Sequence, residues 1–263
     1  MRSQQFEKNL LRQVSRSFYL TLRVLPGSIR PQIGLAYLLA RATDTIADTR
    51  LVSVERRLSA LREMRAAISD AADGCVARVP DFGELAAAQP APAGQGSRAE
   101  RILLERVAEA LDVLRGLTPD DRQRIREVLD IIVRGQEMDL VLFGEATEER
   151  LKALETDAEL DEYTYRVAGC VGEFWTRMCR AHLFPKASLD DVFFLSSSVR
   201  FGKGLQLVNI LRDIPRDLRQ GRCYIPLTRL AECGLKPLDL LDPANMPRFR
   251  PVYDGYLKEV EGH

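Results

Sequence analysis

The chain has 263 residues, 46% of them hydrophobic, which allows one sizeable core and does not require a second domain. Lysine and arginine together number 38, as do aspartate and glutamate, so no global positive charge favours nucleic acid as a partner. Five cysteines without a CxxC pair and two distant histidines argue against a disulfide framework and against a zinc site.

We expect no signal peptide and no transmembrane segment, because no apolar run reaches the roughly 20 residues that a membrane span needs. The sequence therefore predicts a cytoplasmic protein with reduced cysteines. A membrane-associated protein with a peripheral membrane contact is compatible with this prediction.

Apolar residues recur at the three- and four-residue spacing of a helix, and sustained alternation of polar with β-branched residues is missing. The sequence therefore predicts an all-α fold. After a first helix that ends before Pro26-Gly27, we expect helices over about 28–47, 53–72, 99–114, 119–142, 158–182 and 189–214. Thr118 before Pro119 predicts one helix start, and Ser188 with Asp191 predicts another.

Residues 86–97 are mostly alanine, proline, glycine and serine, which predicts a flexible surface loop. We interpret this loop as an insertion within a single domain that covers residues 1–263. The chain ends inside a helical pattern over 251–261 without a stop signal, so we expect a chain truncated at its C-terminus.

Two pairs of aspartates share the same spacing. Asp44 and Asp48 lie four residues apart in one apolar helical pattern, and Asp213 and Asp217 repeat this spacing at the end of another. Four-residue spacing places both carboxylates of a pair on one helix face, where like charges repel unless a cation binds. Oxygen ligands without histidine or thiolate favour Mg²⁺, which commonly binds carboxylates together with substrate phosphates.

The alternative to a metal site is a solvated or salt-bridged helix face. One DxxxD is common, but polar groups continue along both stripes: Tyr37 and Arg41 precede Asp44, and Gln206 and Asn209 precede Asp213. Short amide side chains suit the binding of a water or a phosphate oxygen, whereas a salt-bridged stripe would favour long side chains of alternating charge. The sequence therefore favours a phosphate ester as substrate.

Pro215 lies between the two aspartates of the second pair. Because proline disfavours a helix at the preceding residue and lacks a backbone donor, we expect Asp217 to project from a loosened last turn.

Five motifs in the same order and with the same internal spacing resemble the squalene/phytoene synthase family. They extend from residue 15 to residue 226: Ser15-Arg16-Ser17-Phe18, Tyr37-xxx-Arg41-xx-Asp44-xxx-Asp48, Tyr163-Thr164-Tyr165-Arg166-Val167-Ala168-Gly169-Cys170-Val171-Gly172, Gln206-xx-Asn209-xx-Arg212-Asp213-xxx-Asp217 and Gly221-Arg222-xx-Ile225-Pro226. The resemblance implies an isoprenoid synthase helical bundle with a central apolar cavity and with the two DxxxD motifs facing each other across its mouth.

The resemblance also implies roles for individual residues. Mg²⁺ would be held by Asp44, Asp48, Asp213 and Asp217. The diphosphate would be met by Ser17, Arg41, Gln206, Asn209, Arg212 and Arg222, and the reacting carbons by Tyr37 and Tyr163, with Arg41 a catalytic candidate as well. Phe18 is a candidate substrate contact; the alternative for it, as for Phe174 and Trp175, is plain core.

Three further features of the sequence bear on the fold and the site. Gly169 and Gly172 provide a smooth face either for a prenyl chain or for a neighbouring helix. Gly202-Lys203-Gly204 lies inside a helical pattern, which argues against a nucleotide-binding loop. The polar residues Arg134, Gln136, Glu137 and Asp139 form a cluster of which 135–139 resembles a cavity-facing segment of the family.

The activity implied is head-to-head condensation of two farnesyl diphosphates through presqualene diphosphate to squalene, with Mg²⁺ and with NADPH as the hydride donor. Asp44-Thr45-Ile46-Ala47-Asp48 resembles squalene synthases more than the Asp-Asp-Ile-x-Asp of phytoene synthases. The alternatives are a phytoene or dehydrosqualene synthase, which needs no hydride, and a non-catalytic helical relative, which would not need all four aspartates.

Overall fold

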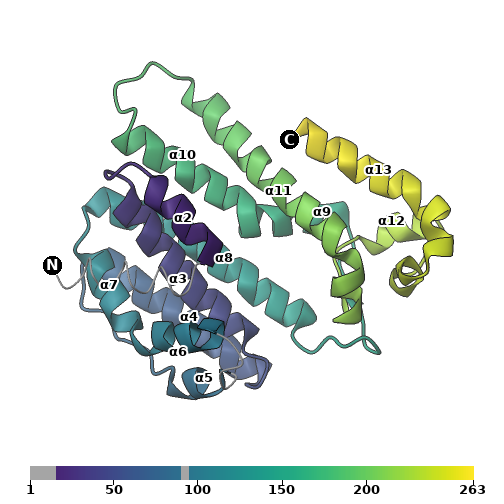
Figure 1. Cartoon of the computed structure of the whole chain (residues 1–263), viewed down its shortest axis with the longest axis horizontal. Coiled ribbons are helices and arrows are strands. Elements are labelled where there is room, and N and C mark those ends of the chain that lie inside the picture. The colour runs from purple at the N-terminus through teal and green to yellow at the C-terminus, as the bar shows by residue number, and fades with distance from the viewer. Residues whose placement is uncertain (1–15, 90–94) are drawn as a thin grey trace. The chain divides into compact units, whose positions relative to one another are not determined.

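The computed structural model describes residues 16–89 and 95–263. It contains two compact units, of which the first comprises the described residues up to 137 together with 177–187, and the second comprises 138–176 and 188–263. Figure 1 traces the helices along the chain. The prediction of an all-α fold is confirmed, since the only strands among the described residues are β1 (Lys152–Ala153) and β2 (Arg222–Cys223).

The first unit is built mainly from the helices of the first half of the chain. In chain order they are α2 (Arg16–Val24), α3 (Arg30–Asp48), α4 (Val54–Ala72), α5 (Gly83–Ala87), α6 (Gln95–Glu105), α7 (Val107–Arg115) and the first part of α8 (Pro119–Phe143). Helix α3 contacts α2, α4, α6 and α7. It buries apolar residues on successive turns, and its buried face includes Leu35, Leu39 and Ile46.

Local sequence signals account for the helix starts in this unit. Ser53 Oγ accepts a hydrogen bond from the Arg56 backbone at 3.3 Å and caps α4. Thr118 Oγ1 accepts one from the Asp121 backbone at 3.3 Å, which confirms the predicted start of α8.

The second unit surrounds the long helix α11. Its elements after α8 are β1, α9 (Asp157–Thr164), the π-helical turn η1 (Tyr165–Gly169), α10 (Cys170–His182), α11 (Asp191–Arg219), β2, α12 (Leu227–Glu232), the 3₁₀ turns η2 (Pro237–Leu241) and η3 (Pro243–Asn245), and α13 (Met246–Gly262). Residues of α10 from Arg177 onward belong to the first unit. Helix α11 contacts α9, η1, β2 and α13.

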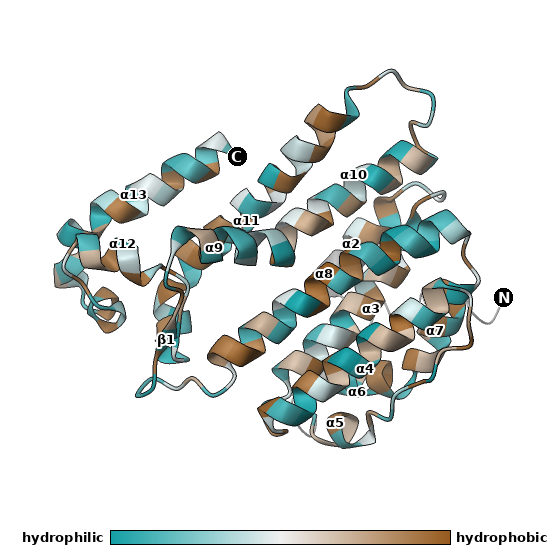
Figure 2. Cartoon of the chain, turned by 180° about the vertical axis from the view of Figure 1, so that it is seen from behind, coloured by the Kyte–Doolittle hydropathy of each residue, from teal (hydrophilic) through white to brown (hydrophobic). Residues whose placement is uncertain are grey.

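The core of the second unit joins distant parts of the chain. Its buried residues include Phe143, Leu160, Leu211, Ile225 and Tyr256. The two short strands pair in parallel, with Lys152 opposite Arg222, and so fix the chain that follows α11. In Figure 2 hydrophobic and hydrophilic residues alternate along α10 and α11, as expected of amphipathic helices.

Several expected boundaries differ from the structure. The α11 N-cap is Asp190, whose Oδ1 accepts from the Phe193 backbone at 3.0 Å, so the predicted Ser188 cap is wrong. The helix expected over 99–114 is interrupted at Arg106, where φ is −114°. A π turn interrupts the helix expected over 158–182, because the five residues of η1 adopt wider hydrogen bonding.

The loop expected over 86–97 is shorter than predicted. Residues 86 and 87 end α5, and α6 begins at Gln95, while 90–94 lie outside the described residues. Ala86 is buried, and Gln89 Nε2 donates to Thr49 Oγ1 at 2.7 Å, so this side of the segment is anchored. Small side chains such as alanine fit a closely packed contact as well as they fit a loop, so the composition of this segment did not distinguish the two.

The expected loosening at Pro215 is also wrong. Helix α11 continues through Pro215 to Arg219, and Leu218 is buried in the core of the second unit. Burial of the last turn offsets the backbone hydrogen bond that proline removes. Asp217 therefore stays one helical turn after Asp213.

Candidate active site

The first aspartate pair lies on α3 in the first unit. Gln136 Nε2 of α8 donates a hydrogen bond to Asp44 Oδ1, and Arg41 Nη1 lies 3.9 Å from Asp44 Oδ2. Asp48, one turn further on, is exposed. Two residues of the predicted polar stripe on this helix, Arg41 and Asp44, therefore contact each other. Gln136 joins them from another helix.

The surroundings of Asp44 disfavour its charge. Burial raises the pKa of Asp44 to about 6; Arg41 and the hydrogen bond from Gln136 act in the opposite direction, and the charge of Asp48 adds to the rise. The side chain still exposes 47% of its surface, so a ligand can reach it. Burial likewise raises the pKa of Tyr37, which lies within the field of Arg41 and Asp44.

Arg41 has a second partner that the sequence did not indicate. Its Nη2 donates to Glu100 Oε1 of α6, a residue 59 positions away. The guanidinium is thus held between Glu100 and Asp44, with 30% of its side chain exposed.

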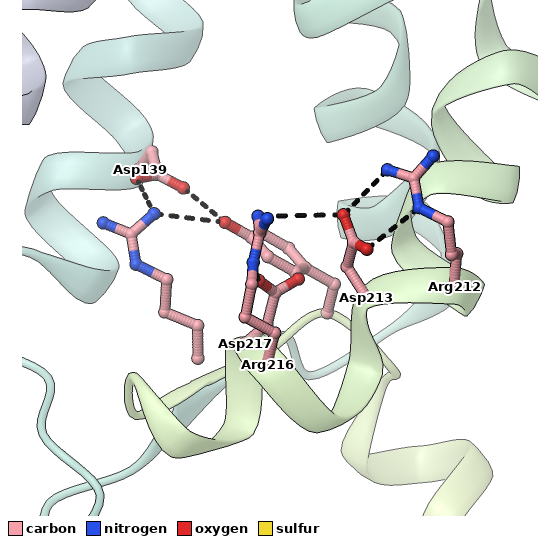
Figure 3. Close-up of polar contacts among 7 residues, drawn as sticks. Asp139, Arg212, Asp213, Arg216 and Asp217 are labelled. Carbon is pink, nitrogen blue, oxygen red and sulfur yellow. Dashed lines mark hydrogen bonds and ion pairs between the residues drawn. The ribbon is translucent and has the colours of Figure 1, made fainter. Parts of the chain in front are cut away.

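The second aspartate pair lies on α11 in the second unit and is surrounded by arginines (Figure 3). Arg212 binds both oxygens of Asp213, each at 2.9 Å, and Arg216 lies 3.7 Å from Asp213 and 3.7 Å from Asp217. The hydrogen bond from Arg212 lowers the pKa of Asp213, whereas burial raises the pKa of Asp217. Arg212 and Arg216 remain largely exposed and available to an anion.

Gln206 and Asn209 lie on α11 within two turns before Asp213. Asn209 Nδ2 is 3.4 Å from Gln206 Oε1, so the two amides face each other as their three-residue spacing predicts.

Arg222 is held by an aspartate and by aromatic rings. Its Nη1 donates to Asp139 Oδ2 at 3.0 Å, and Tyr224 OH donates to Asp139 Oδ1 at 3.0 Å (Figure 3). The guanidinium carbon lies 5.8 Å from the ring centre of Phe143. Burial alone would lower the pKa of Arg222, but the charge of Asp139 raises it overall. Tyr163 stacks on Tyr224 with ring centres 4.7 Å apart.

The structure gathers the predicted residues into two groups. On α3 are Tyr37, Arg41, Asp44 and Asp48; in the second unit are Tyr163, Gln206, Asn209, Arg212, Asp213, Asp217 and Arg222. Ser17 and Phe18 fall on α2, and their side chains lie outside the described residues. The predicted roles of all these residues remain predictions.

The polar cluster on α8 separates into two kinds of residue. Gln136 contacts Asp44 and Asp139 contacts Arg222, whereas Arg134 pairs with Asp130 and Glu137 with Arg65. Sequence reasoning missed Glu100 and Tyr224. The two-residue spacing of Arg222 and Tyr224 in an extended segment was the available signal for Tyr224, since it places both side chains on one face.

An apolar cavity of about 510 Å³ lies beside η1, α10 and α11 in the second unit. Its lining includes Val171, Trp175, Phe201 and Leu205, while Phe174 is buried core. A Cβ on Gly172 would collide with the Ser198 carbonyl, so this glycine serves the helix contact and also borders the cavity. Gly202, which lies inside α11, packs likewise on the Ala168 carbonyl of η1. The segment around Gly202 is therefore helical and not a nucleotide-binding loop.

The donors near Asp44 fit a hard cation. Gln136 Oε1 is buried without a hydrogen-bond partner beside a carboxylate whose charge is disfavoured. Within residues 16–89 and 95–263 no three His, Cys, Asp or Glu side chains form a complete metal-binding cluster. Mg²⁺ suits this arrangement because it typically takes one or two carboxylates and completes its shell with water and substrate phosphates.

The helical fold is that of the isoprenoid synthases. TcSQS in complex with a ligand matches with a TM-score of 0.72 at 22% identity, covering 99% of this chain and 68% of that one. The squalene synthase from Alicyclobacillus acidocaldarius matches with a TM-score of 0.64 at 18% identity, covering 99% and 80%. At these identities the likeness establishes the fold.

A model of the squalene/phytoene synthase family matches residues 11–263. The chain therefore belongs to the squalene/phytoene synthase family and is an enzyme of the prenyltransferase type, as the five motifs predicted. The presqualene diphosphate synthase of Zymomonas mobilis is 31% identical over 253 residues, which cover 95% of this chain and 69% of that protein. A bifunctional lycopene cyclase/phytoene synthase of Phaeosphaeria nodorum is 30% identical over 95% of this chain and 40% of its own length.

No helix among the described residues is both long and apolar enough to cross a lipid bilayer.

Proposed function

We propose that this protein is a Mg²⁺-dependent prenyltransferase that joins two farnesyl diphosphates head to head, forming presqualene diphosphate and releasing diphosphate. With NADPH as reductant, we propose squalene as the end product. Membership of the family supports the reaction class, and the presqualene diphosphate synthase of Z. mobilis supports the first product.

The surroundings of Asp44 are the observation that carries this proposal. A carboxylate with a disfavoured charge lies one turn from a second carboxylate and beside the unpartnered oxygen of Gln136. A salt-bridged helix face would satisfy these groups internally. A bound cation would satisfy all three, and the diphosphate of a substrate would complete its coordination.

Mg²⁺, when bound by Asp44, Asp48, Asp213 and Asp217, would neutralise charge on the leaving diphosphate. The arginines of the chain would add to this effect. Arg212 and Arg216 expose 64% and 70% of their side chains, and planar guanidinium groups bind phosphate oxygens bidentately. Gln206 and Asn209 would orient the same anion through amide hydrogens.

The carbon chemistry needs an apolar, water-poor environment. The allylic C–O bond of one substrate breaks, the double bond of the second attacks the resulting cation, and loss of a proton closes the cyclopropane. The cavity lined by Val171, Trp175 and Phe201 offers apolar walls for a prenyl chain. Tyr163 would present a phenol oxygen to the positive charge near the reacting carbons.

The last step separates the possible products. Hydride transfer gives squalene, proton loss gives dehydrosqualene or, from a longer substrate, phytoene, and no second step leaves presqualene diphosphate. The fungal relatives are bifunctional phytoene synthases, which supports phytoene as the second candidate. Because the described residues show no dinucleotide-binding loop, we assign no residue to NADPH.

The test is incubation of the protein with farnesyl diphosphate and Mg²⁺, with and without NADPH, followed by mass spectrometry of the extracted products. Squalene formed only with NADPH is the expected result. Presqualene alcohol after phosphatase treatment, or dehydrosqualene, would change the product but keep the reaction class. Geranylgeranyl diphosphate tests for phytoene.

Asp44→Asn and Asp213→Asn are expected to lower turnover at least about 100-fold, because each removes a charge that would bind the cation opposite the leaving group. The matched control is Asp130→Asn on α8, a half-buried aspartate that pairs with Arg134 and Arg65 and is not among the predicted site residues. Absence of turnover with both substrates by the unaltered protein would favour the non-catalytic relative instead.

A further inference from the structure

Arg41 lies between two acidic side chains of the first unit. Its Nη2 donates a hydrogen bond to Glu100 Oε1 of α6, whereas its Nη1 lies 3.9 Å from Asp44 Oδ2 on its own helix. The second distance is longer than a hydrogen bond, so Asp44 gains only an attraction through space. Of the two carboxylates, Glu100 is therefore the one that binds the guanidinium directly.

The packing of α6 fixes the position of Glu100. Helix α6 contacts α3, and Ala99 and Leu103 on either side of Glu100 in the sequence are each 1% exposed. The side chain of Glu100 is 22% exposed, compared with 47% for Asp44. Because solvent and salt screen an enclosed ion pair less than an exposed one, the contact of Arg41 with Glu100 is the more persistent of the two.

The two oxygens of Asp44 differ in their surroundings. Gln136 Nε2 donates to Asp44 Oδ1, while Oδ2 receives no hydrogen bond from Arg41 at 3.9 Å. A guanidinium that came within hydrogen-bond distance would occupy Oδ2, because charge-assisted hydrogen bonds between arginine and carboxylate are strong. Mg²⁺ takes carboxylate oxygens as ligands, so the guanidinium and a metal ion compete for the same atom.

We propose that Glu100 is a positioning residue that holds Arg41 away from Asp44 and so keeps Asp44 Oδ2 available to a cation. The inference rests on the proposed function, in which Asp44 binds Mg²⁺. Glu100 has a second effect in the same direction, because its charge balances that of Arg41. A cation that approaches Asp44 then meets a neutral ion pair in place of a net positive charge.

The variant Glu100→Gln separates the charge of this side chain from its shape. It keeps the length of the side chain, and its amide oxygen can still accept a hydrogen bond from Arg41. The charge that attracts the guanidinium is gone, however, so Asp44 is the only carboxylate left of the two. Because an ion pair is stronger than the contact of an ion with a neutral amide, we expect the guanidinium to move to Asp44 Oδ2. A metal ion would then have to displace it.

The first experiment measures the dissociation constant of Mn²⁺ from the loss of the free-ion EPR signal, since Mn²⁺ prefers the same oxygen ligands as Mg²⁺. Glu100→Gln should raise this constant about 10–100-fold, the range for residues that hold a metal ligand from behind. The matched control is Glu105→Gln, which removes the same charge from the same helix, where Glu105 pairs with Arg101 at 2.8 Å. An unchanged constant in Glu100→Gln, or equal shifts in both variants, would overturn the proposal.

The second experiment needs neither metal nor turnover, so it stays informative if the proposed function is wrong. A metal-free crystal structure of Glu100→Gln should place Arg41 within hydrogen-bond distance of Asp44, in contrast to the 3.9 Å of the unaltered protein. An Arg41 side chain that keeps its place beside residue 100 would refute the role of Glu100. A shift of Arg41 in that structure, when the unaltered protein binds no Mn²⁺, would refute only the proposed metal site. Should Glu100→Gln fail to fold, Glu100→Ala answers both questions, because alanine removes the same charge and favours a helix.

Discussion

Asp121 is a buried carboxylate in the first turn of α8, and its polar neighbours keep it charged. His182 Nε2 lies 2.7 Å and Arg124 Nη1 3.0 Å from its Oδ1, and Gln32 Nε2 donates to its Oδ2 at 3.2 Å. Burial alone would raise the pKa of Asp121, but the hydrogen bonds with His182 and Gln32 lower it below the ordinary value. Three helices of the first unit thus meet at one charge.

Asp121→Asn is expected to lower the free energy of unfolding at pH 7 by about 1–3 kcal/mol, the cost of weakening a buried, charge-assisted set of hydrogen bonds. Because the folded-state pKa is depressed, this stabilisation is present above the unfolded-state value of about 3.9 and is lost as the pH falls through the folded-state pKa. Urea unfolding at pH 7 and at about pH 3 measures it. The same difference between the two proteins at both pH values would contradict the assignment.

At the residue scale, the sequence predicted the candidate site residues better than it predicted the residues that contact them. The family motifs named Asp44 and Arg222, but not Glu100 beside Arg41 or Tyr224 beside Asp139. These partners lie 59 and 85 positions away, and only the folded chain brings them together. The bonds of Asp121 to Gln32 and His182 likewise join residues that lie 89 and 61 positions apart.

At the scale of elements, the turn from α11 into β2 depends on one glycine. Gly221 has a φ of +79°, a conformation that costs other residues about 1–2 kcal/mol. A Cβ there would also collide with the Thr147 carbonyl. The strand pairing of Lys152 with Arg222 starts immediately after this turn, so Gly221 helps to place the Arg222 guanidinium.

Gly221→Ala should therefore destabilise the protein by more than about 2 kcal/mol and reduce turnover, because both the turn and Arg222 must move. The control is Gly255→Ala in α13, where a Cβ meets nothing within 4 Å. That change should be neutral or stabilise by up to about 1 kcal/mol, since alanine favours a helix. Thermal unfolding of the two variants distinguishes these results, and equal losses would contradict the role of the turn.

The sequence predicted elements well where local signals decide. Helices expected over 28–47, 53–72 and 119–142 occur as Arg30–Asp48, Val54–Ala72 and Pro119–Phe143, since apolar periodicity lies within each segment. Ser53 and Thr118 also cap the second and third of them. It failed at Pro215, where burial of Leu218 overrides a local preference against helix. The π turn η1 likewise left no trace in the apolar pattern.

At the scale of the whole molecule, ligand binding and folding are linked. If the aspartate pairs bind Mg²⁺ through a shared diphosphate, Mg²⁺ and inorganic pyrophosphate together should raise the unfolding free energy by about 2.7 kcal/mol at 100 times the dissociation constant. Either one alone should raise it less. Differential scanning calorimetry with and without EDTA measures this effect.

Asp44→Asn should remove most of this joint stabilisation without lowering the stability of the metal-free protein, because it deletes a charge that burial disfavours. Asp130→Asn again serves as the control. Full stabilisation of the Asp44→Asn protein by Mg²⁺ and pyrophosphate would contradict the metal assignment.

The π turn over Tyr165–Gly169 has a consequence for how this segment tolerates change. A π turn accommodates one residue more than an α-helix does, and each residue of an α-helix turns the chain by about 100°. Deleting one residue there would restore a continuous helix and rotate Trp175, which lines the cavity, about the helix axis relative to Tyr163. An insertion or deletion among these five residues would therefore rotate the following helix, α10, about its axis. The length of this segment alone thus sets the direction in which the α10 side chains point.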